Sequence, residues 1–408
     1  MKILVLYHAS VQDRRPGADV HIYFTCKLLS LKNEVTLVTW GHGRSSSEHD
    51  GNLMIIHFGD DTHNENSRSG SKMPPALREL VSYFGLNYIL FLRNKGPSAR
   101  DFFGKIRVDF DLVLRVSFNK NTIPPFMKKK FGIPVVEMAT VAGLPHYLQN
   151  LSKWMEFIGH TSIYNSKIAK SIYQIFRLIV SRLYKSTLAS NNLITVSVSD
   201  TVEMKAIGVE DVNFIPVIYY FEGKVPLGLS GNYVLFYSSN NVVADIAFRF
   251  ILNAARRVQE VAFVVTGNYE SLVGQTNFPD NLKLLGYLPE DEFRATIQNC
   301  SVVIFPLISG SGIQTKMLEA LYLGKPIITT SVIASEFPEI ENGRDVIIED
   351  DPDNFVTQIR NLMGNPRLRS QLQENARKYY LQHFSPELAL TLLEEYMADV
   401  IRKDKGLS

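Results

Sequence analysis

The chain has 408 residues, 45% of them hydrophobic and 21% charged, and a formal net charge of +2. These values indicate a globular protein of two or three domains, and no apolar run approaches the roughly 18 residues of a transmembrane helix. Polar residues follow Met1–Leu6 too soon for a signal peptide. The two cysteines, Cys26 and Cys300, lie far apart in apolar segments. We therefore expect structural thiols in a cytoplasmic protein.

The predicted elements of residues 1–217 alternate between strands and helices. Short runs of β-branched and aromatic residues indicate buried strands, and apolar periodicity indicates helices. Ser199 is the expected N-cap, and Gly208 the expected C-cap, of the last helix. The strands are expected at Lys2–Tyr7, Glu34–Thr39, Leu53–Phe58, Leu112–Val116, Ile133–Met138, Leu193–Val198 and Asn213–Val217, and the helices at Val20–Leu31, 75–91, 154–190 and Asp200–Ile207.

The pattern restarts after a linker at residues 222–228. It predicts an α/β fold of two doubly wound domains with a cleft between them. We expect the domains at 1–217 and 218–385, with a C-terminal helix at about 386–408 packing back on the first. The strands are expected at Tyr233–Tyr237, Val261–Thr266, Leu282–Leu284, Ser301–Pro306, Ile327–Ile328 and Val346–Ile348, and the helices at Val243–Val258, Glu290–Asn299, Gln314–Leu323, Pro352–Leu362, Pro366–His383 and Pro386–Arg402.

The two halves differ in charge. Residues 1–216 hold 26 Lys+Arg and 18 Asp+Glu, a balance of +8, whereas the remaining residues hold 17 and 23, a balance of −6. Unless this asymmetry is chance, it indicates two domains with different partners.

Residues 309–330, SGSGIQTKMLEALYLGKPIITT, read as a glycine turn, a helix and a buried strand that follow another buried strand. In such a unit the turn lies at the carboxyl edge of the sheet, where α/β folds bind ligands. A phosphate is stabilised at the helix N-terminus, within reach of Lys316, and Glu319 lies one turn deeper, where a carboxylate accepts from a sugar diol. The pattern therefore predicts a nucleotide or nucleotide-sugar site. An ordinary turn followed by a solvated Lys–Glu pair is the alternative.

A series of motifs in the second half resembles the C-terminal domain of GT-B glycosyltransferases of the retaining family 4 type. The motifs are VAFVVTG (261–267), NLKLLGYLPEDEFRATIQNCSVVIFPL (281–307), GSGIQTKMLEALYLGKPIITT (310–330) and ENGRDVIIEDDPDNFVTQIRNLMGNPRLRSQLQENARKYYLQHFS (341–385). The first half resembles the family more loosely, through MKILVLYHAS, PGAD and NEVTLVTW. The resemblance implies a GT-B fold of two Rossmann-like domains facing across a cleft.

The resemblance also implies roles for individual residues. Glu319 matches the glutamate on the donor ribose, Gly286 and Tyr287 match the segment near the base, and Gly17 matches a first-domain glycine near the phosphates. The loop that faces the diphosphate and donor sugar corresponds to Gly310, Ser311, Gly312, Ile313 and Gln314. Members of the family generally use no metal, so we expect none here, and we expect no cofactor.

The chain departs from the family pattern at several positions. Ser311 stands where the family often has a second glutamate, and the usual Arg and Lys pair after the first strand of the second domain is missing. We therefore expect Lys316 to be the cation for the leaving diphosphate and, with Glu319, a catalytic residue. The family's first-domain histidine has no clear counterpart. Glu137 and His146 are the candidates on the acceptor side, although His146 is also typical of a surface loop.

Two other features have functional and structural readings. Asp109 and Asp111 have the spacing of a metal-binding pair, but they also precede a strand, where carboxylates commonly end a loop. The stretch 166–186 combines an apolar stripe with lysines and arginines, and Lys128–Lys130 add charge. This pattern is typical of a helix on an anionic membrane surface, or of a core helix with a solvated basic edge. No nucleic-acid-binding motif accompanies the charge.

We interpret the chain as a cytoplasmic glycosyltransferase, with possible docking on the inner face of the membrane. It would move a sugar from a nucleoside-diphosphate sugar to a glycan or lipid-linked acceptor, as in polysaccharide biosynthesis. A nucleotide-sugar epimerase of the same fold remains an alternative. So does a non-catalytic nucleotide-sugar-binding module, because of Ser311 and the missing cation pair.

Overall fold

The computed structural model describes residues 1–7, 18–42, 45–60, 102, 106, 108–116, 123–139, 192–218, 231–238, 242–267, 269, 278–308 and 313–406. The chain divides into two compact units. Unit 1 comprises Met1–Ile218, Ser311–Ile313 and Glu387–Ser408, and unit 2 comprises Tyr219–Gly310 and Gln314–Pro386. The helices expected at 75–91 and 154–190 and the linker at 222–228 lie outside the described residues.

Unit 1 is built on an eight-stranded sheet in the described part of the chain. All neighbouring strands are parallel except β3 and β4, which are antiparallel at one edge. Parallel strands require crossover connections, which explains the βαβ alternation of the sequence. The strands in spatial order are β3 (Ser46–Asp50), β4 (Leu53–Asp60), β2 (Glu34–His42), β1 (Lys2–Tyr7), β5 (Leu112–Val116), β6 (Val135–Ala139), β7 (Asn192–Thr195) and β8 (Asp211–Phe214).

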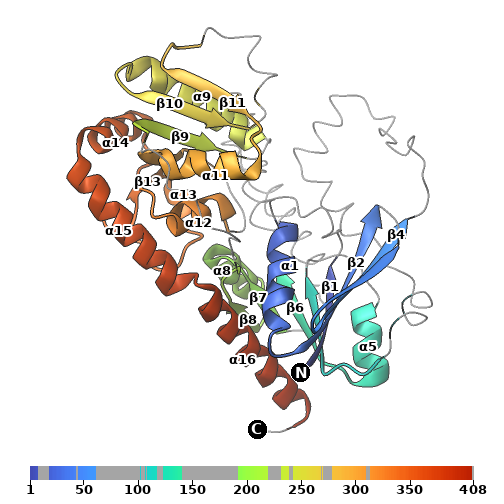
Figure 1. Ribbon diagram of the computed structural model, residues 1–408. Coiled ribbons are helices and arrows are strands. Elements are labelled where there is room, and N and C mark those ends of the chain that lie inside the picture. Colours follow the sequence, from blue (N-terminus) through green and yellow to red (C-terminus); the bar gives the residue numbers. More distant parts are fainter. Residues whose placement is uncertain are drawn as a thin grey trace, which may run out of the picture. The chain divides into compact units, whose positions relative to one another are not determined.

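Helices cover both faces of this sheet, as Figure 1 shows for α1 (Ala18–Leu29) and α5 (Ile123–Phe131). One core cluster joins the strands to α1 and to α16 (Pro386–Asp404), which contributes Leu393, Met397 and Val400. A second cluster on the other face includes Met127 of α5. The C-terminal helix therefore completes the hydrophobic core of unit 1.

Unit 2 contains a six-stranded parallel sheet in the part of the chain that the structure describes. The central strands β9 and β12 are buried except for Tyr233 and carry almost no polar residues, which is typical of a sheet covered on both faces. The strands in spatial order are β11 (Leu282–Gly286), β10 (Ala262–Thr266), β9 (Tyr233–Tyr237), β12 (Val302–Phe305), β13 (Ile327–Thr329) and β14 (Ile347–Ile348). The helices are α9 (Val242–Arg257), α11 (Glu290–Asn299), α12 (Thr315–Tyr322), α13 (Ser331–Ala334), α14 (Pro352–Gly364) and α15 (Pro366–His383).

The observed elements confirm the predicted α/β fold. The strands at Lys2–Tyr7, Leu112–Val116 and Tyr233–Tyr237 and the helices at Glu290–Asn299 and Pro366–His383 have the predicted bounds. The elements that were not predicted are short or poorly patterned: β3, α5 and α13.

The predicted N-cap Ser199 is wrong. The helix α8 (Val198–Ala206) begins two residues earlier than predicted, and its N-cap is Ser197, whose hydroxyl accepts from the backbone N–H of Asp200 at 3.2 Å. Both serines satisfy the sequence rule for a cap. The extended backbone of Ser197 decides between them. Within the described ranges, no helix combines the length and apolar character needed to cross a membrane.

Candidate functional site

The first part of the candidate site is the end of β11, at the carboxyl edge of the unit 2 sheet. Gly286 has a φ of +66°, a conformation that L side chains rarely adopt, so glycine suits this turn. Its carbonyl accepts from the N–H of Gly267 at the end of the neighbouring β10, at 2.9 Å. The next residue, Tyr287, is 76% exposed. An exposed aromatic ring therefore follows a backbone turn that is held in place by the adjacent strand.

The second part is the N-terminus of α12, which follows β12 at the same edge. Gln314 is the N-cap residue, and its side chain makes no capping hydrogen bond. Burial of Met317, Leu318 and Leu321 on one face packs the helix into the core of unit 2. A helix N-terminus favours negative charge through its N–H groups and its dipole. This end of α12 thus provides an electrostatically suitable environment for a phosphate group.

Lys316 lies in the first turn of α12 and is partly buried. Burial lowers the pKa of its ammonium to about 8, while the negative charge of Glu319 acts in the opposite direction. The lysine is therefore protonated over most of the neutral range but close enough to titration to respond to a new charge. A diphosphate placed beside it would favour the protonated form.

Glu319 lies one turn further along α12 and is only 5% exposed. It belongs to the buried face of the helix, where a carboxylate needs hydrogen-bond or charge partners. Its charge acts on Lys316, three residues earlier. The structure therefore brings the two predicted residues together on successive turns of one helix, at the edge of the sheet where β11 ends.

One supporting residue, Tyr237, was not predicted from the sequence. This buried tyrosine ends the central strand β9, and its hydroxyl donates to the backbone carbonyl of Lys316 at 2.8 Å. Its ring packs edge-on against Phe293 and Phe305, with centroid distances of 5.2 and 5.5 Å. Tyr237 thereby anchors the first turn of α12 to the sheet. A tyrosine at the end of a buried strand was the available signal, because a buried hydroxyl requires a partner.

The remaining donor-side residues are only partly described. Ile313 and Gln314 directly precede α12 and are partly exposed. Gly17, Gly310, Ser311, Gly312 and His146 lie outside the described residues, and their expected roles stay predictions.

Glu137, a predicted acceptor-side residue, lies inside the unit 1 sheet. It is 0% exposed, and its Oε2 is 2.5 Å from Nε of Arg115. The two residues are register partners on the parallel strands β6 and β5. Neither side chain reaches solvent, so Glu137 forms a buried ion pair with Arg115 inside the sheet.

The alternative metal pair, Asp109 and Asp111, is found at the other end of β5. Asp109 accepts from Nζ of Lys2 at 2.7 Å, and Asp111 accepts from the backbone N–H of Lys2 at 2.8 Å. Both carboxylates therefore hold the start of β1. In the described part of the chain, no cluster of three or more His, Cys, Asp or Glu residues has the arrangement of a metal site.

The predicted basic surface is described only in part. Lys128, Lys129 and Lys130 are exposed in the last turn of α5. Phe131 follows and is 42% exposed. The amphipathic stretch 166–186 lies outside the described residues.

Comparison with known proteins identifies the second half of the chain. Residues 231–365 match the family model described as Glycosyl transferases group 1. This range contains β9 to α14, including Gly286, Tyr287, Lys316 and Glu319. That part of the chain is therefore similar to group 1 glycosyl transferases.

Solved structures resemble the chain over almost its whole length. Sucrose-phosphate synthase from Thermosynechococcus elongatus has a TM-score of 0.63 and 12% identity and covers 98% of this chain and 99% of its own. HepE of Anabaena, in complex with UDP, has a TM-score of 0.63 and 13% identity, and the match covers 98% of this chain and 100% of the HepE chain. Trehalose 6-phosphate synthase from Burkholderia multivorans has a TM-score of 0.60 and 12% identity, and the match covers 98% of this chain and 99% of the synthase chain. At these identities the likeness establishes the fold, which is the GT-B architecture of two Rossmann-like domains.

Proposed function

We propose that this protein is a glycosyltransferase that moves a sugar from a nucleoside-diphosphate sugar to a glycan or lipid-linked acceptor. One observation carries the proposal. Lys316 and Glu319 occupy successive turns of α12 at the carboxyl edge of a parallel sheet, inside a group 1 glycosyl transferase domain. This edge is where doubly wound folds bind nucleotides.

We propose a uridine nucleotide as the donor. HepE of Anabaena is similar in fold and has been solved with UDP and with UDP-glucose. In this chain the diphosphate would lie at the N-terminus of α12 beside Lys316, and the ribose diol would donate to Glu319. We assign the base to the end of β11, where Tyr287 follows Gly286 and its ring is exposed.

The proposed reaction is a retaining, metal-independent transfer of the family 4 type. Negative charge accumulates on the diphosphate as the bond to the sugar breaks. Preorganised donors and cations accelerate such a step by stabilising the charge that develops. Lys316 and the first N–H groups of α12 would supply that stabilisation, and Tyr237 would hold the lysine's backbone in place.

We propose that unit 1 binds the acceptor, and that its basic surface docks on an anionic membrane when the acceptor is lipid-linked. The exposed Lys128–Lys130 and Phe131 of α5 support this proposal. Each lysine near an anionic surface contributes about 1 kcal/mol. Co-sedimentation with anionic and neutral vesicles tests it. Binding to anionic vesicles should fall at high salt and after all three lysines are changed to glutamate.

A non-catalytic nucleotide-sugar-binding module is the second candidate, and Ser311 favours it. A serine there removes a carboxylate that the resemblance places on the donor sugar. Incubation with UDP-glucose and candidate acceptors, followed by product analysis, separates the possibilities. A new glycoside supports the proposal, an epimerised nucleotide sugar indicates the epimerase, and binding without turnover indicates the module. A thermal-shift screen of nucleotides should precede it, because a ligand of the folded state raises the apparent stability.

A further inference from the structure

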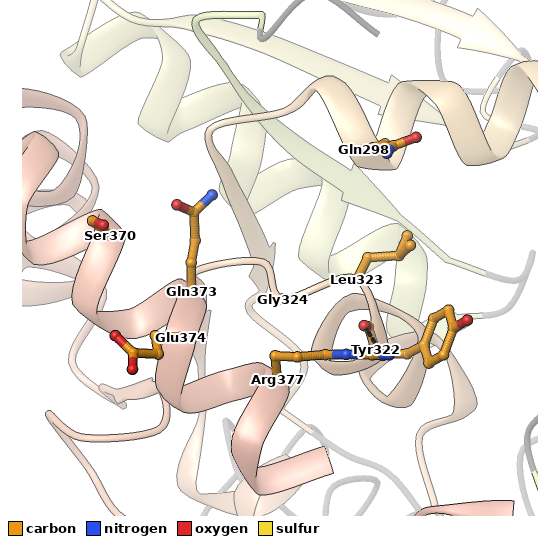
Figure 2. Close-up of a pocket in the computed structure, with 8 residues that line it drawn as sticks. All are labelled: Gln298, Tyr322, Leu323, Gly324, Ser370, Gln373, Glu374 and Arg377. Carbon is orange, nitrogen blue, oxygen red and sulfur yellow. Dashed lines mark hydrogen bonds between the residues drawn. The ribbon is translucent and has the colours of Figure 1, made fainter. Parts of the chain in front are cut away.

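Unit 2 has an open polar hollow at the opposite edge of the sheet from the candidate donor site. Its volume is about 560 Å³, within the range of roughly 300–1,000 Å³ typical of small-molecule sites. It lies where α11 and α12 end, before β12 and β13 begin, and α15 forms one wall (Figure 2). The donor residues Gly286 and Lys316 lie at the carboxyl ends of strands, so this hollow is a separate place in the fold.

The wall formed by α15 is a polar stripe. Ser370, Gln373, Glu374 and Arg377 follow the i, i+3, i+4, i+7 spacing of one helix face, and all four line the hollow. The apolar face of the same helix carries Leu372, Ala376, Tyr379 and Tyr380, which are buried. The helix therefore packs its apolar face into the core and presents hydroxyl, amide, carboxylate and guanidinium groups to the hollow.

Arg377 is held rigidly in this wall. Its guanidinium lies 4.3 Å from the ring centroid of Tyr322 and 5.7 Å from that of Tyr380. Its Nη1 donates to the backbone carbonyl of Tyr322, and Figure 2 shows the side chain reaching from α15 toward that residue. No other hydrogen bond of this guanidinium is found among the described residues. A planar group fixed by stacking keeps its remaining donors in a constant direction, which lowers the entropic cost of binding.

The opposite side of the hollow is equally well defined. Gly324 has a φ of +61°, and a Cβ atom there would lie 3.1 Å from the backbone oxygen of Gln373. The turn after α12 therefore lies directly against the backbone of α15. On α11, the side-chain oxygen of Gln298 is buried and has no hydrogen-bond partner within the described ranges.

We infer that this hollow binds a saccharide unit of a neutral glycan, away from the reaction centre. Glu374 and Arg377 balance in formal charge, so the lining does not select a phosphate or another strong anion. Amides and hydroxyls both donate and accept hydrogen bonds, as sugar hydroxyls do. The choice of a saccharide over another neutral polyhydroxyl compound rests on the proposed function, since a glycosyltransferase acts on glycans. Such a site would retain a growing chain near the enzyme between transfers.

Saturation-transfer NMR on the full chain tests this inference, with linear tetrasaccharides of glucose, galactose and mannose as probes. The measurements are made with and without saturating UDP. We expect at least one tetrasaccharide to receive saturation in both conditions. The double variant Gln373→Ala/Glu374→Ala changes two exposed side chains and should weaken that binding at least tenfold. The matched control, Gln371→Ala/Lys378→Ala, changes two exposed positions of α15 that do not line the hollow and should bind like the wild type.

Three results would overturn the inference. They are no saturation transfer to any of the three probes, equal binding by the double variant and the control, and loss of binding when UDP is added. The last result would place the saccharide at the donor edge. Failure of this inference can be distinguished from failure of the proposed function, because UDP binding and glycosyl transfer are measured without the tetrasaccharides. Arg377→Ala is not used as a test, because it would also remove the cation–π contact with Tyr322 and the hydrogen bond that joins α15 to the end of α12.

Discussion

Each unit of the protein holds a cation and a carboxylate close together inside its fold, and the two pairs differ in how the cation is bound. In unit 1, Arg115 and Glu137 are buried and contact each other directly across neighbouring strands. In unit 2, Lys316 and Glu319 lie on successive turns of a helix, and burial lowers the pKa of the lysine to about 8. An arginine stays protonated at any accessible pH, whereas this lysine responds to pH and to a bound anion. The first pair is therefore suited to maintaining the fold, whereas the second has the properties that our proposed substrate-binding role requires.

The largest expected effect on stability comes from breaking the pair in unit 1. Arg115→Met should lower the free energy of unfolding by about 3–5 kcal/mol, because it leaves a buried carboxylate without its cation. Urea denaturation followed by circular dichroism measures the change. Lys403→Met removes an exposed cation that contacts Asp399 on α16, and it serves as the control with little expected change. Equal stability of the two variants would contradict a structural role for the buried pair.

The next effect concerns turnover in unit 2. Lys316→Ala should lower kcat by about 100- to 1,000-fold, the usual effect of removing one preorganised group that stabilises developing charge. The loss should appear in kcat more than in KM, because charge on the diphosphate is largest in the transition state. Initial rates with UDP-glucose, or with whichever donor the screen identifies, measure both constants. A change confined to KM would show that the lysine contributes equally to ground-state and transition-state binding.

Glu319→Gln should weaken nucleotide binding by about 1.5–3 kcal/mol, because it replaces a charge-assisted hydrogen bond to the ribose with a neutral one. The variant should remain folded, since glutamine has nearly the same size. Calorimetric titration with UDP measures the affinity. Glu292→Gln, on the exposed side of α11, is the matched control and should bind as the wild type does. A folded Glu319→Gln variant with unchanged affinity would remove the ribose role.

The smallest expected effect sharpens the assignment of Tyr237. Tyr237→Phe and Tyr233→Phe each delete a hydroxyl on β9 that donates to a backbone carbonyl, of Lys316 and Thr296 respectively. Each change should cost about 0.5–1.5 kcal/mol in stability. Only Tyr237→Phe should also lower kcat, because only that hydroxyl holds the first turn of α12. If both variants lost the same activity, Tyr237 would have no positioning role beyond general stability.

The sequence predicted the parts of this molecule that depend on local pattern. Buried strands such as Tyr233–Tyr237 and proline-initiated helices such as Pro366–His383 have strong signals, and the α/β alternation follows from them. Short elements such as β3 and α5 have weak signals, since Ser46–Asp50 is entirely polar and exposed. The placement of Lys316 and Glu319 on one helix at a sheet edge followed from spacing.

Long-range partners could not be predicted in the same way. Glu137 and Arg115 are 22 residues apart, and only strand register brings them together. The hydroxyl of Tyr237 finds a carbonyl 79 residues away. Such contacts depend on how the strands and helices pack, and neither Arg115 nor Tyr237 stands in a recognisable motif. The acceptor-side role expected for Glu137 came from its polarity within an apolar segment, and its buried partner Arg115 accounts for that polarity.

If Lys316 contacts the donor diphosphate as we propose, the protein should take up protons when the nucleotide binds. As pH rises through about 8, free Lys316 loses its proton, so a diphosphate that needs the cation must restore it. The same low pKa means that the folded state binds fewer protons than the unfolded chain between pH 8 and the ordinary lysine value. The free energy of unfolding should therefore rise with pH through that range, as the penalty for burying the charged ammonium of Lys316 disappears.

The measurement is calorimetric titration with UDP at pH 8.5 in two buffers of different ionisation enthalpy. The wild type should take up a substantial fraction of a proton on binding UDP, whereas Lys316→Arg, whose guanidinium is already charged, should bind UDP with almost no uptake. Equal proton uptake by the two proteins, or the absence of UDP binding by the wild type, would show that Lys316 does not bind the diphosphate of UDP.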